Sequence, residues 1–376
     1  MKKALIVTSV ASMIQQFNMI NIDLLQSMGF DVEVACNFED GNTISQKKIA
    51  EFKTVLRDLD VKFYQVDFSR NITSISGHLK SYKQLQKIVD NTDYSFVHCQ
   101  APIAGIITRM IKFPSSKIIY TAHGFHFYRG APLKNWLLFY PLEKVFSRRT
   151  NDLITINSED YHFAKKKFYA KKVSYVHGVG LSTKKFDKVQ VAELDNIKKF
   201  NDDIVFLSIG ELNDNKNHEQ VINELKKISD KHFIYLICGV GNKESYLKQI
   251  ISENKLDDRV FLLGYREDIP SLLAAADVYI HPSKREGLPV SVMEAMYQGL
   301  PICCSSIRGN KDLVQHGVNG YLVDLHSSKQ GFSYYLNNFF YDEDLATQMG
   351  KNSNKLVQPF LEVNVINELR KIYGRY

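Results

Sequence analysis

Two carboxylates that flank a turn suited to phosphate give the first indication of chemistry. Glu286 and Glu294 are separated by seven residues, which begin with Gly287-Leu288-Pro289. Proline suits the first turn of a helix, where unpaired backbone N–H groups and the positive end of the dipole bind phosphate. One carboxylate can therefore meet the far end of a phosphate-bearing ligand, and the other can meet the hydroxyls of its near end. The alternative is an ordinary strand, turn and amphipathic helix with two solvated glutamates, and the spacing alone does not decide.

A histidine and a lysine follow two other apolar runs. His123 comes directly after residues 118–121 and before Gly124, which lets the chain turn sharply. We therefore expect His123 to project from the carboxyl end of a strand. Lys216 lies in a polar loop that begins after Gly210, at the end of another apolar run. A histidine that merely caps a loop, or a solvated lysine, would have the same local sequence.

Short apolar runs alternate with longer stretches of helical periodicity, and they form two series. The first series comprises residues 3–8, 31–36, 62–67, 95–99, 117–121 and 152–157, and the second comprises 204–210, 233–238, 260–263, 278–281, 301–304 and 320–323. The polar, lysine-rich stretch 181–201 between them is typical of an interdomain linker. The order predicts an α/β protein with two doubly wound parallel sheets, whose ligands lie at the carboxyl ends of the strands.

Taken together, the motifs resemble those of the family 4 glycosyltransferases, which use nucleotide sugars and have the GT-B fold. The matching residues are His281-Pro282-Ser283 with Glu286-Gly287, Gly299-Leu300-Pro301, Thr121-Ala122-His123-Gly124, and Gly210 with Lys216. Longer matches at 120–128 and 130–138 resemble bacterial capsule and exopolysaccharide glycosyltransferases. The resemblance implies two Rossmann-like domains that face each other across a cleft: an acceptor-side domain over 1–190 and a nucleotide-sugar donor domain over 191–355, with a helix over 356–376 that crosses back to the first domain.

The resemblance also implies roles for single residues. The implied donor site consists of Gly210, Lys216, Tyr265, Arg266, Gly287, Leu288 and Glu294. Lys216 would pair with the donor diphosphate, and Glu294 would hold the ribose hydroxyls. Backbone N–H groups at 287 and 288 would meet the phosphates, and the segment 264–266 would frame the nucleobase. The implied catalytic residues are His123, which orients substrate and stabilises charge, and Glu286, which accepts hydrogen bonds from the donor sugar.

At one position the chain departs from the family pattern. The family usually has an arginine directly after the glycine, where this chain has Glu211. A carboxylate that faces a diphosphate costs stability, so Glu211 is expected to point elsewhere or to pair with a cation. Arg266, Arg285 and Arg308 are the candidates for the missing positive charge, and the sequence does not choose among them.

The acceptor pocket is expected in the first half of the chain, which is also the basic half. Its expected border consists of Arg70, Asn71, Phe125, His126 and Arg129, since aromatic walls suit sugar rings and arginine suits a diphosphate. Of the net charge of +7, residues 1–190 contribute 27 Lys and Arg against 16 Asp and Glu, and the remainder has a balance of −4. No nucleic-acid-binding motif accompanies this charge, which favours an anionic membrane or a lipid diphosphate.

Two segments, 133–149 and 165–172, interleave bulky apolar side chains with basic ones. We expect them to lie on an anionic membrane, with Trp136, Phe139 and Tyr140 at headgroup level. The alternative is a helix that packs on the core and has a solvated basic face.

Several features restrict the class of protein. The five cysteines have no C-x-x-C spacing and lie in apolar runs, which indicates reduced core thiols in the cytosol. The apolar run after Lys2-Lys3 is a better first strand than a signal peptide, and no segment approaches the roughly 20 apolar residues needed to cross a bilayer. The two D-x-D matches, 58–60 and 342–344, are interpreted as solvated turns, so we expect no metal and no other cofactor.

These observations favour one function over two others. We expect a retaining glycosyltransferase, cytoplasmic and peripheral on the inner face of the cell membrane, that transfers a hexose or N-acetylhexosamine from a UDP-sugar. Its acceptor would be a polyprenyl-diphosphate-linked saccharide in capsular or exopolysaccharide synthesis. The alternatives are a nucleotide-sugar 2-epimerase on the same architecture and a non-catalytic subunit that binds sugar nucleotides. The motifs do not specify the sugar, the linkage position or the oligomeric state.

Overall fold

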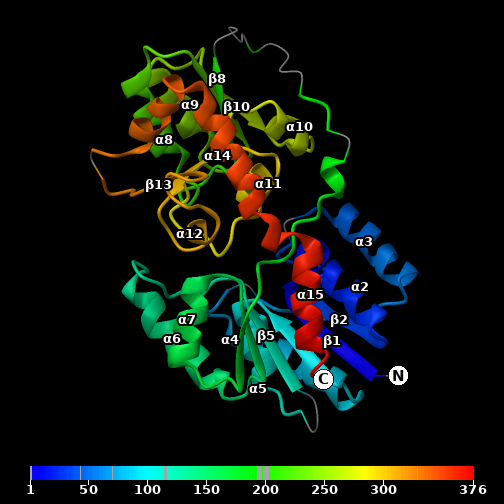
Figure 1. Ribbon diagram of the computed structural model, residues 1–376. Coiled ribbons are helices and arrows are strands. Elements are labelled where there is room, and N and C mark those ends of the chain that lie inside the picture. Colours follow the sequence, from blue (N-terminus) through cyan, green and yellow to red (C-terminus); the bar gives the residue numbers. More distant parts are fainter. Residues whose placement is uncertain are drawn as a thin grey trace. The chain divides into compact units, whose positions relative to one another are not determined.

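The chain forms two compact units, which are described separately below (Figure 1). The structure is a computed structural model that describes residues 2–42, 44–69, 71–113, 117–187, 189–192, 197, 203–327 and 329–376. The first unit comprises Met1–Gly180 and Glu362–Tyr376, and the second comprises Leu181–Leu361. Each unit has one parallel sheet covered by helices, which confirms the predicted fold class.

The sheet of the first unit has seven strands in the order β3-β2-β1-β4-β5-β6-β7, and all neighbours are parallel. The strands are β1 (Lys2–Val10), β2 (Phe30–Asn37), β3 (Lys62–Gln65), β4 (Phe96–Gln100), β5 (Lys117–Ala122), β6 (Asp152–Thr155) and β7 (Lys172–Tyr175). The first six coincide with the predicted runs to within a few residues. The seventh was missed because it is only four residues long and begins inside a basic stretch that had been interpreted as membrane-binding.

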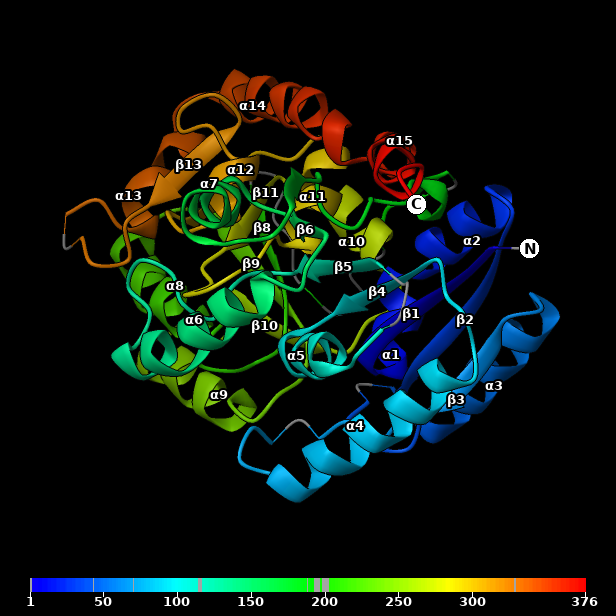
Figure 2. The same cartoon turned by 90° about the horizontal axis from the view of Figure 1, so that it is seen from below.

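Helices cover both faces of this sheet. They are α1 (Ala11–Phe17), α2 (Met19–Ser27), α3 (Gln46–Asp58), α4 (Ile75–Asp90), α5 (Pro102–Met110), α6 (Leu133–Ser147), α7 (Ser158–Lys167) and α15 (Glu362–Tyr373). Alternate strand residues point to opposite faces, so the unit has two cores. Buried residues of α2, α3 and α15 pack in one core, and those of α4, α5, α6 and α7 pack in the other. Figure 2 shows α2 and α15 on one side of the strands and α4 and α5 on the other.

The second unit has a six-stranded parallel sheet in the order β10-β9-β8-β11-β12-β13. Its strands are β8 (Ile204–Ile209), β9 (Phe233–Cys238), β10 (Val260–Gly264), β11 (Val278–His281), β12 (Ile302–Ser305) and β13 (Gly320–Val323). The helices are α8 (His218–Leu225), α9 (Glu244–Glu253), α10 (Ile269–Ala274), α11 (Val290–Tyr297), α12 (Asn310–Leu313), α13 (Phe332–Leu336) and α14 (Glu343–Leu356), with short 3₁₀ turns at Lys184–Phe186, Lys226–Ile228, Asn337–Phe340 and Gln358–Phe360. All six strands of this unit were predicted.

In both sheets the strand order reverses beside a central strand. In the first unit β1 lies between β2 and β4, and in the second β8 lies between β9 and β11. The connections on the two sides of such a point leave in opposite directions, so the carboxyl ends of the two central strands open a crevice for ligands. In the second unit those ends are Ile209 of β8 and His281 of β11.

The rings of α6 do not lie where the membrane interpretation placed them. Phe139 is buried, and Trp136 and Tyr140 pack at 5.5 Å each from the ring of Phe127 and at 5.9 and 5.8 Å from Phe163. The placement of these rings at headgroup level is therefore wrong. Spacing alone misassigned them because apolar residues occur all round this helix, and only packing decides which of them turn inward.

Candidate active site

The carboxyl ends of β8 and β11 carry a compact group of charged and polar side chains. Lys216 Nζ donates a hydrogen bond of 2.7 Å to Glu286 Oε1. His281 Nε2 lies 3.2 Å from the same oxygen and 3.2 Å from Ser283 Oγ. Lys216 and Glu286 are 70 positions apart in the sequence, so the tertiary fold alone brings them together.

The glutamate of this group is held as a carboxylate. Burial alone would raise the pKa of Glu286, but the hydrogen bond from His281 and the charge of Lys216 outweigh burial and lower the pKa to about 2. Burial lowers the pKa of His281, which favours a neutral ring. A carboxylate can only accept, so the ring nitrogen beside Glu286 must carry the proton. The group therefore presents an anionic acceptor and a cation side by side.

Hydrogen bonds between backbone and side chains fasten the two loops of the group to each other. The backbone N–H of Lys284 donates to the carbonyl of Asn215 at 2.8 Å, and the Asn215 side chain donates to the carbonyl of Arg285 at 3.1 Å. Asn217 donates in the same way to the carbonyl of Pro282 at 3.2 Å. The position of Lys216 relative to the turn before α11 is thus set by backbone contacts on both sides of it.

Two glycines permit close contacts at the ends of β8 and β9. A Cβ atom on Gly210 would lie 3.1 Å from both Cδ and Cε of Lys216, so the lysine stem crosses directly over this glycine. Gly239 has a φ of +152°, and a Cβ there would lie 1.9 Å from the Gly210 carbonyl oxygen. The end of β9 can therefore approach the end of β8 only if residue 239 lacks a side chain.

The turn before α11 is supported from the opposite side by the loop after β12. Arg308 is buried, and its Nε donates to the carbonyl of Glu286 at 3.3 Å. A Cβ on Gly309 would lie 2.6 Å from the Gly287 carbonyl oxygen, so these backbones are in close contact. Leu288 is buried and anchors the turn. The first-turn N–H groups of α11 begin at residue 290, beside this turn.

Glu294 lies within α11 and is paired with a lysine that was not predicted. Lys185 Nζ donates to Glu294 Oε1, and the carboxylate is buried. The neighbouring Phe186 packs at 5.1 Å from the ring of Tyr297, which docks this part of the connecting segment on α11. No pattern in the sequence could have indicated the pair, because the two residues are 109 positions apart and the lysine lies in a polar stretch.

The structure separates the candidates for the missing positive charge. Arg266 forms a bidentate pair with Asp268, at 2.7 and 2.5 Å, so its charge is already compensated. Arg285 is exposed, and Glu211 is exposed as well. Arg308 is the candidate that contacts the Glu286 turn. Tyr265 is 67% exposed, so its ring is available to a flat ligand.

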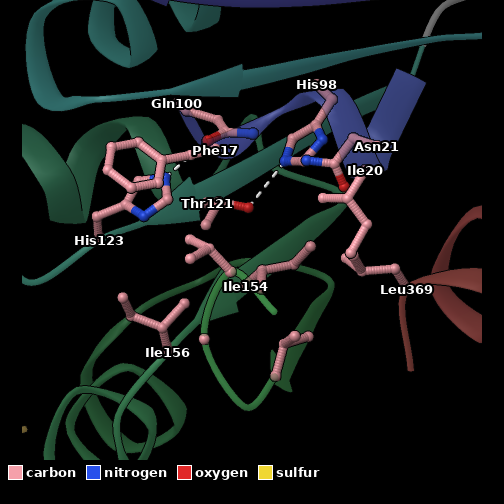
Figure 3. Close-up of a pocket in the computed structure, with 13 residues that line it drawn as sticks. Phe17, Ile20, Asn21, His98, Gln100, Thr121, His123, Ile154, Ile156 and Leu369 are labelled. Carbon is pink, nitrogen blue, oxygen red and sulfur yellow. Dashed lines mark hydrogen bonds between the residues drawn. The ribbon is translucent and has the colours of Figure 1, made fainter. Parts of the chain in front are cut away.

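His123 lies in the first unit, at the carboxyl end of β5. Its Nε2 is 2.7 Å from Gln100 Oε1 at the end of β4, and its ring lies 6.3 Å from that of Phe17 (Figure 3). Burial lowers the pKa of His123 to about 4, so the ring is neutral near pH 7. The small cavity beneath it, about 20 Å³, has room for one water molecule and not for a sugar. Gln100 was missed, although a polar residue at the end of an apolar run is the same signal that identified His123.

The residues expected to border the acceptor pocket have different environments. Phe125 is buried and stacks on Phe127 at 5.0 Å, so its assignment to a pocket wall is wrong: this ring belongs to the core. His126 is half-buried beside Phe139, and Arg129 and Asn71 are exposed. Arg70 lies outside the described residues.

Comparisons with known proteins agree with this architecture. A family model described as glycosyl transferases group 1 matches residues 191–356, and one described as glycosyl transferase 4-like matches residues 7–157. The putative glycosyltransferase EpsD of Bacillus subtilis is 31% identical, over 100% of this chain and 97% of EpsD. The chain belongs to the family 4 glycosyltransferases. Its family, its GT-B fold and its likeness to capsule and exopolysaccharide enzymes were all predicted.

Two further relatives extend the comparison. An Escherichia coli UDP-Gal:alpha-D-GlcNAc-diphosphoundecaprenol alpha-1,3-galactosyltransferase is 28% identical to this glycosyltransferase, over 96% of the chain and 93% of the relative. Among solved structures, Anabaena HepE in complex with UDP and glucose superposes with a TM-score of 0.74 over the full length of both chains, at 19% identity. The second likeness shows the GT-B fold.

The contact between Gly210 and Lys216 gives a testable prediction. Gly210→Ala should displace the lysine by a few tenths of an ångström and weaken UDP binding roughly three- to tenfold, or about 1 kcal/mol. Calorimetric titration with UDP measures this, with Lys216→Met as the reference for complete loss of the cation. Unchanged UDP affinity in a folded Gly210→Ala protein would contradict a role of Lys216 in binding UDP.

Proposed function

We propose that this glycosyltransferase is a retaining enzyme that transfers a hexose or N-acetylhexosamine from a UDP-sugar to a polyprenyl-diphosphate-linked saccharide, in capsular or exopolysaccharide synthesis. The observation that carries the proposal is the contact of Lys216 with Glu286 at the strand-order reversal of the second sheet, directly before α11. A cation and the start of a helix can bind a diphosphate, and a carboxylate can accept hydrogen bonds from sugar hydroxyls. A nucleotide sugar contains both a diphosphate and such hydroxyls.

The donor contacts follow from this arrangement. The diphosphate lies at Lys216 and at the first-turn N–H groups of α11, which stabilise the charge as it develops on the leaving group. Lys216 and His281 both contact Oε1 of Glu286, so Oε2 can accept from the hydroxyls of the sugar. Glu294 accepts hydrogen bonds from the ribose hydroxyls. Lys185 must then share the Glu294 carboxylate with the ribose or move away from it. The choice of UDP is supported by the relative that uses UDP-Gal and by HepE, which was solved with UDP.

The acceptor class rests on the relatives and on charge. The Escherichia coli enzyme and a Campylobacter jejuni N,N'-diacetylbacillosaminyl-diphospho-undecaprenol alpha-1,3-N-acetylgalactosaminyltransferase, 25% identical over 86% of this chain, are both named for a lipid diphosphate acceptor. Residues 1–190 carry an excess of positive charge, which would attract such an anionic acceptor.

In the proposed transfer, the bond from the anomeric carbon of the sugar to the diphosphate oxygen breaks, and its electron pair leaves with UDP. The acceptor hydroxyl forms the new bond on the same face, and its proton passes to a phosphate oxygen of the departing diphosphate. His123 orients the reacting groups from the end of β5. Lys216 and α11 supply the charge stabilisation that a divalent cation gives in other transferases, so the proposed reaction needs no metal and no cofactor.

We further propose that the enzyme binds an anionic membrane through α6. Leu133 and Leu137 lie one helical turn apart and are 72% and 71% exposed, and Leu138 beside them is exposed too. Lys134 is exposed between them. Apolar side chains with an adjacent cation suit the headgroup region of an anionic bilayer. No helix in the described ranges is long and apolar enough to cross a membrane.

A donor panel tests the function directly. The purified enzyme is incubated with UDP-hexoses and UDP-N-acetylhexosamines, with and without a polyprenyl-diphosphate saccharide, in EDTA and again in Mg²⁺. We expect UDP release with one donor, accelerated by the lipid acceptor and equal in both buffers. Conversion of the donor to its 2-epimer, or UDP-sugar binding without turnover, would support the two alternative functions. Activity only in Mg²⁺ would contradict the metal-independent mechanism.

The two glutamates should separate binding from transfer. Glu286→Gln should abolish transfer and leave UDP affinity within a few-fold of the parent, because this carboxylate faces the sugar. Glu294→Gln should weaken UDP binding, because it faces the ribose. UDP calorimetry and initial rates measure the two effects. Loss of UDP binding in the first variant with normal binding in the second would mean that the roles are exchanged.

The membrane contact is tested on vesicles. Replacing both Leu137 and Leu138 with Ser should reduce co-sedimentation with anionic vesicles and turnover of a long-chain lipid acceptor, and spare turnover of a short, water-soluble analogue. Binding should also weaken steeply with salt, since each basic residue near the surface contributes about 1 kcal/mol that screening removes. Val363→Ser, an exposed apolar residue on α15, is the matched control. Equal losses on both acceptors, or an equal loss of vesicle binding in the control, would contradict the role of α6.

A further inference from the structure

We propose that Gln100, at the carboxyl end of β4, is a positioning residue for His123. It acts through a chain of buried hydrogen bonds that fixes which ring nitrogen of His123 carries the proton. The proton is held on Nε2, so Nδ1 is the nitrogen that accepts a hydrogen bond from a substrate hydroxyl. This inference deepens the proposed function and rests on it for the role of His123 in transfer.

The chain of hydrogen bonds lies within the first unit and links elements far apart in the sequence. It begins at His123, directly after β5, and it ends at Thr121, within β5. Figure 3 labels Gln100, Thr121, His98 and Asn21. In order, the contacts are His123 Nε2 to Gln100 Oε1 (2.7 Å), Gln100 Nε2 to Asn18 Oδ1, Asn21 Nδ2 to Asn18 Oδ1 (3.0 Å), Tyr373 Oη to Asn21 Oδ1 (2.9 Å), His98 Nδ1 to Tyr373 Oη (2.9 Å) and His98 Nε2 to Thr121 Oγ1 (2.8 Å).

One backbone carbonyl determines the direction of the bonds that lead to His123. The side chain of Asn18 lies 3.0 Å from the carbonyl oxygen of Met13, which can only accept, so the nitrogen of this amide must face it. The oxygen of Asn18 then faces Gln100 and must accept a hydrogen bond from the Gln100 nitrogen. The oxygen of Gln100 is consequently turned to His123. It can only accept, so His123 Nε2 carries the proton.

The same anchor determines the other half of the chain. Since the Asn18 oxygen can only accept, the nitrogen of Asn21 faces it, and the Asn21 oxygen faces Tyr373. The phenol must donate a hydrogen bond to that oxygen, and its own oxygen accepts a hydrogen bond from His98 Nδ1. His98 Nε2 then accepts from the hydroxyl of Thr121. Burial lowers the pKa of His98 to about 3, consistent with a single proton on this ring.

Tyr373 closes the half of the chain that leads away from His123. Its ring is fully buried and stacks on Phe96 at 5.5 Å, so α15 delivers the hydroxyl in a fixed position. Without that hydroxyl, Asn21 and His98 each lose a partner inside the core, but Asn18 and Gln100 keep the Met13 carbonyl as their anchor. Gln100 is the member of the chain that contacts His123, so its loss should change the orientation of that ring and not donor binding.

The test compares Gln100→Leu with Tyr373→Phe. Tyr373→Phe removes a hydroxyl from the half of the chain that does not lead to His123, so it is the control. In the parent, ¹⁵N spectra of the histidine-labelled enzyme should show His123, assigned by its absence in His123→Asn, as a single tautomer protonated on Nε2. Gln100→Leu should give a mixture of tautomers and lower kcat roughly tenfold, as for the loss of one hydrogen bond. KM for the donor should stay within about twofold, and His123 in Tyr373→Phe should keep its proton on Nε2.

Asn18→Leu removes the amide that orients Gln100 and should give the same mixture of tautomers, which covers the case in which Gln100→Leu does not fold. A parent His123 protonated on Nδ1 would overturn the inference, as would parent-like kcat in a folded Gln100→Leu protein. The spectra require no turnover. Absence of transferase activity in the parent, with His123 protonated on Nε2, would therefore contradict the proposed function and leave the bonding arrangement supported.

Discussion

The contact between Lys216 and Glu286 is the interaction on which the second unit's site depends. It joins the loops that follow β8 and β11, the strands on either side of the order reversal. The lysine stem crosses directly over Gly210, and Gly239 lets the end of β9 approach the Gly210 carbonyl from behind. In the proposed function a diphosphate and a sugar replace these two charges as each other's partners. Charges that are held together before a ligand arrives need little rearrangement for this, which is the physical basis of electrostatic preorganisation.

In the first unit, neutral groups orient the candidate site residue His123. His123 has no charged partner in its hydrogen-bonded chain. Its orientation is set by the side-chain amides of Gln100 and Asn18, whose directions follow from the backbone carbonyl of Met13. Such a chain works only when every member is satisfied, because an unpaired buried amide costs as much as the bonds around it provide. The helix that closes the chain, α15, comes from the far end of the sequence and is nevertheless part of the first unit.

The segment over α6 shows where reasoning from composition fails. Its basic and aromatic content suggested rings at a membrane, yet Phe139 is in the core and the exposed apolar residues are Leu133, Leu137, Leu138 and Val145. A helix with apolar residues on all sides has no preferred face in its sequence. The neighbouring rings, Phe127 and Phe163, select the face that is buried.

The sequence by itself determined the family, the two parallel sheets and twelve of their thirteen strands, because apolar runs of strand length and turn motifs are local signals. It also identified His123, Lys216, Glu286 and Glu294 as candidate site residues, since each follows or lies in a local motif. Only the tertiary structure decided their partners. Lys185, 109 positions from its glutamate, and the other members of the hydrogen-bonded chain have no local signature, because a buried contact depends on which distant elements the fold places side by side.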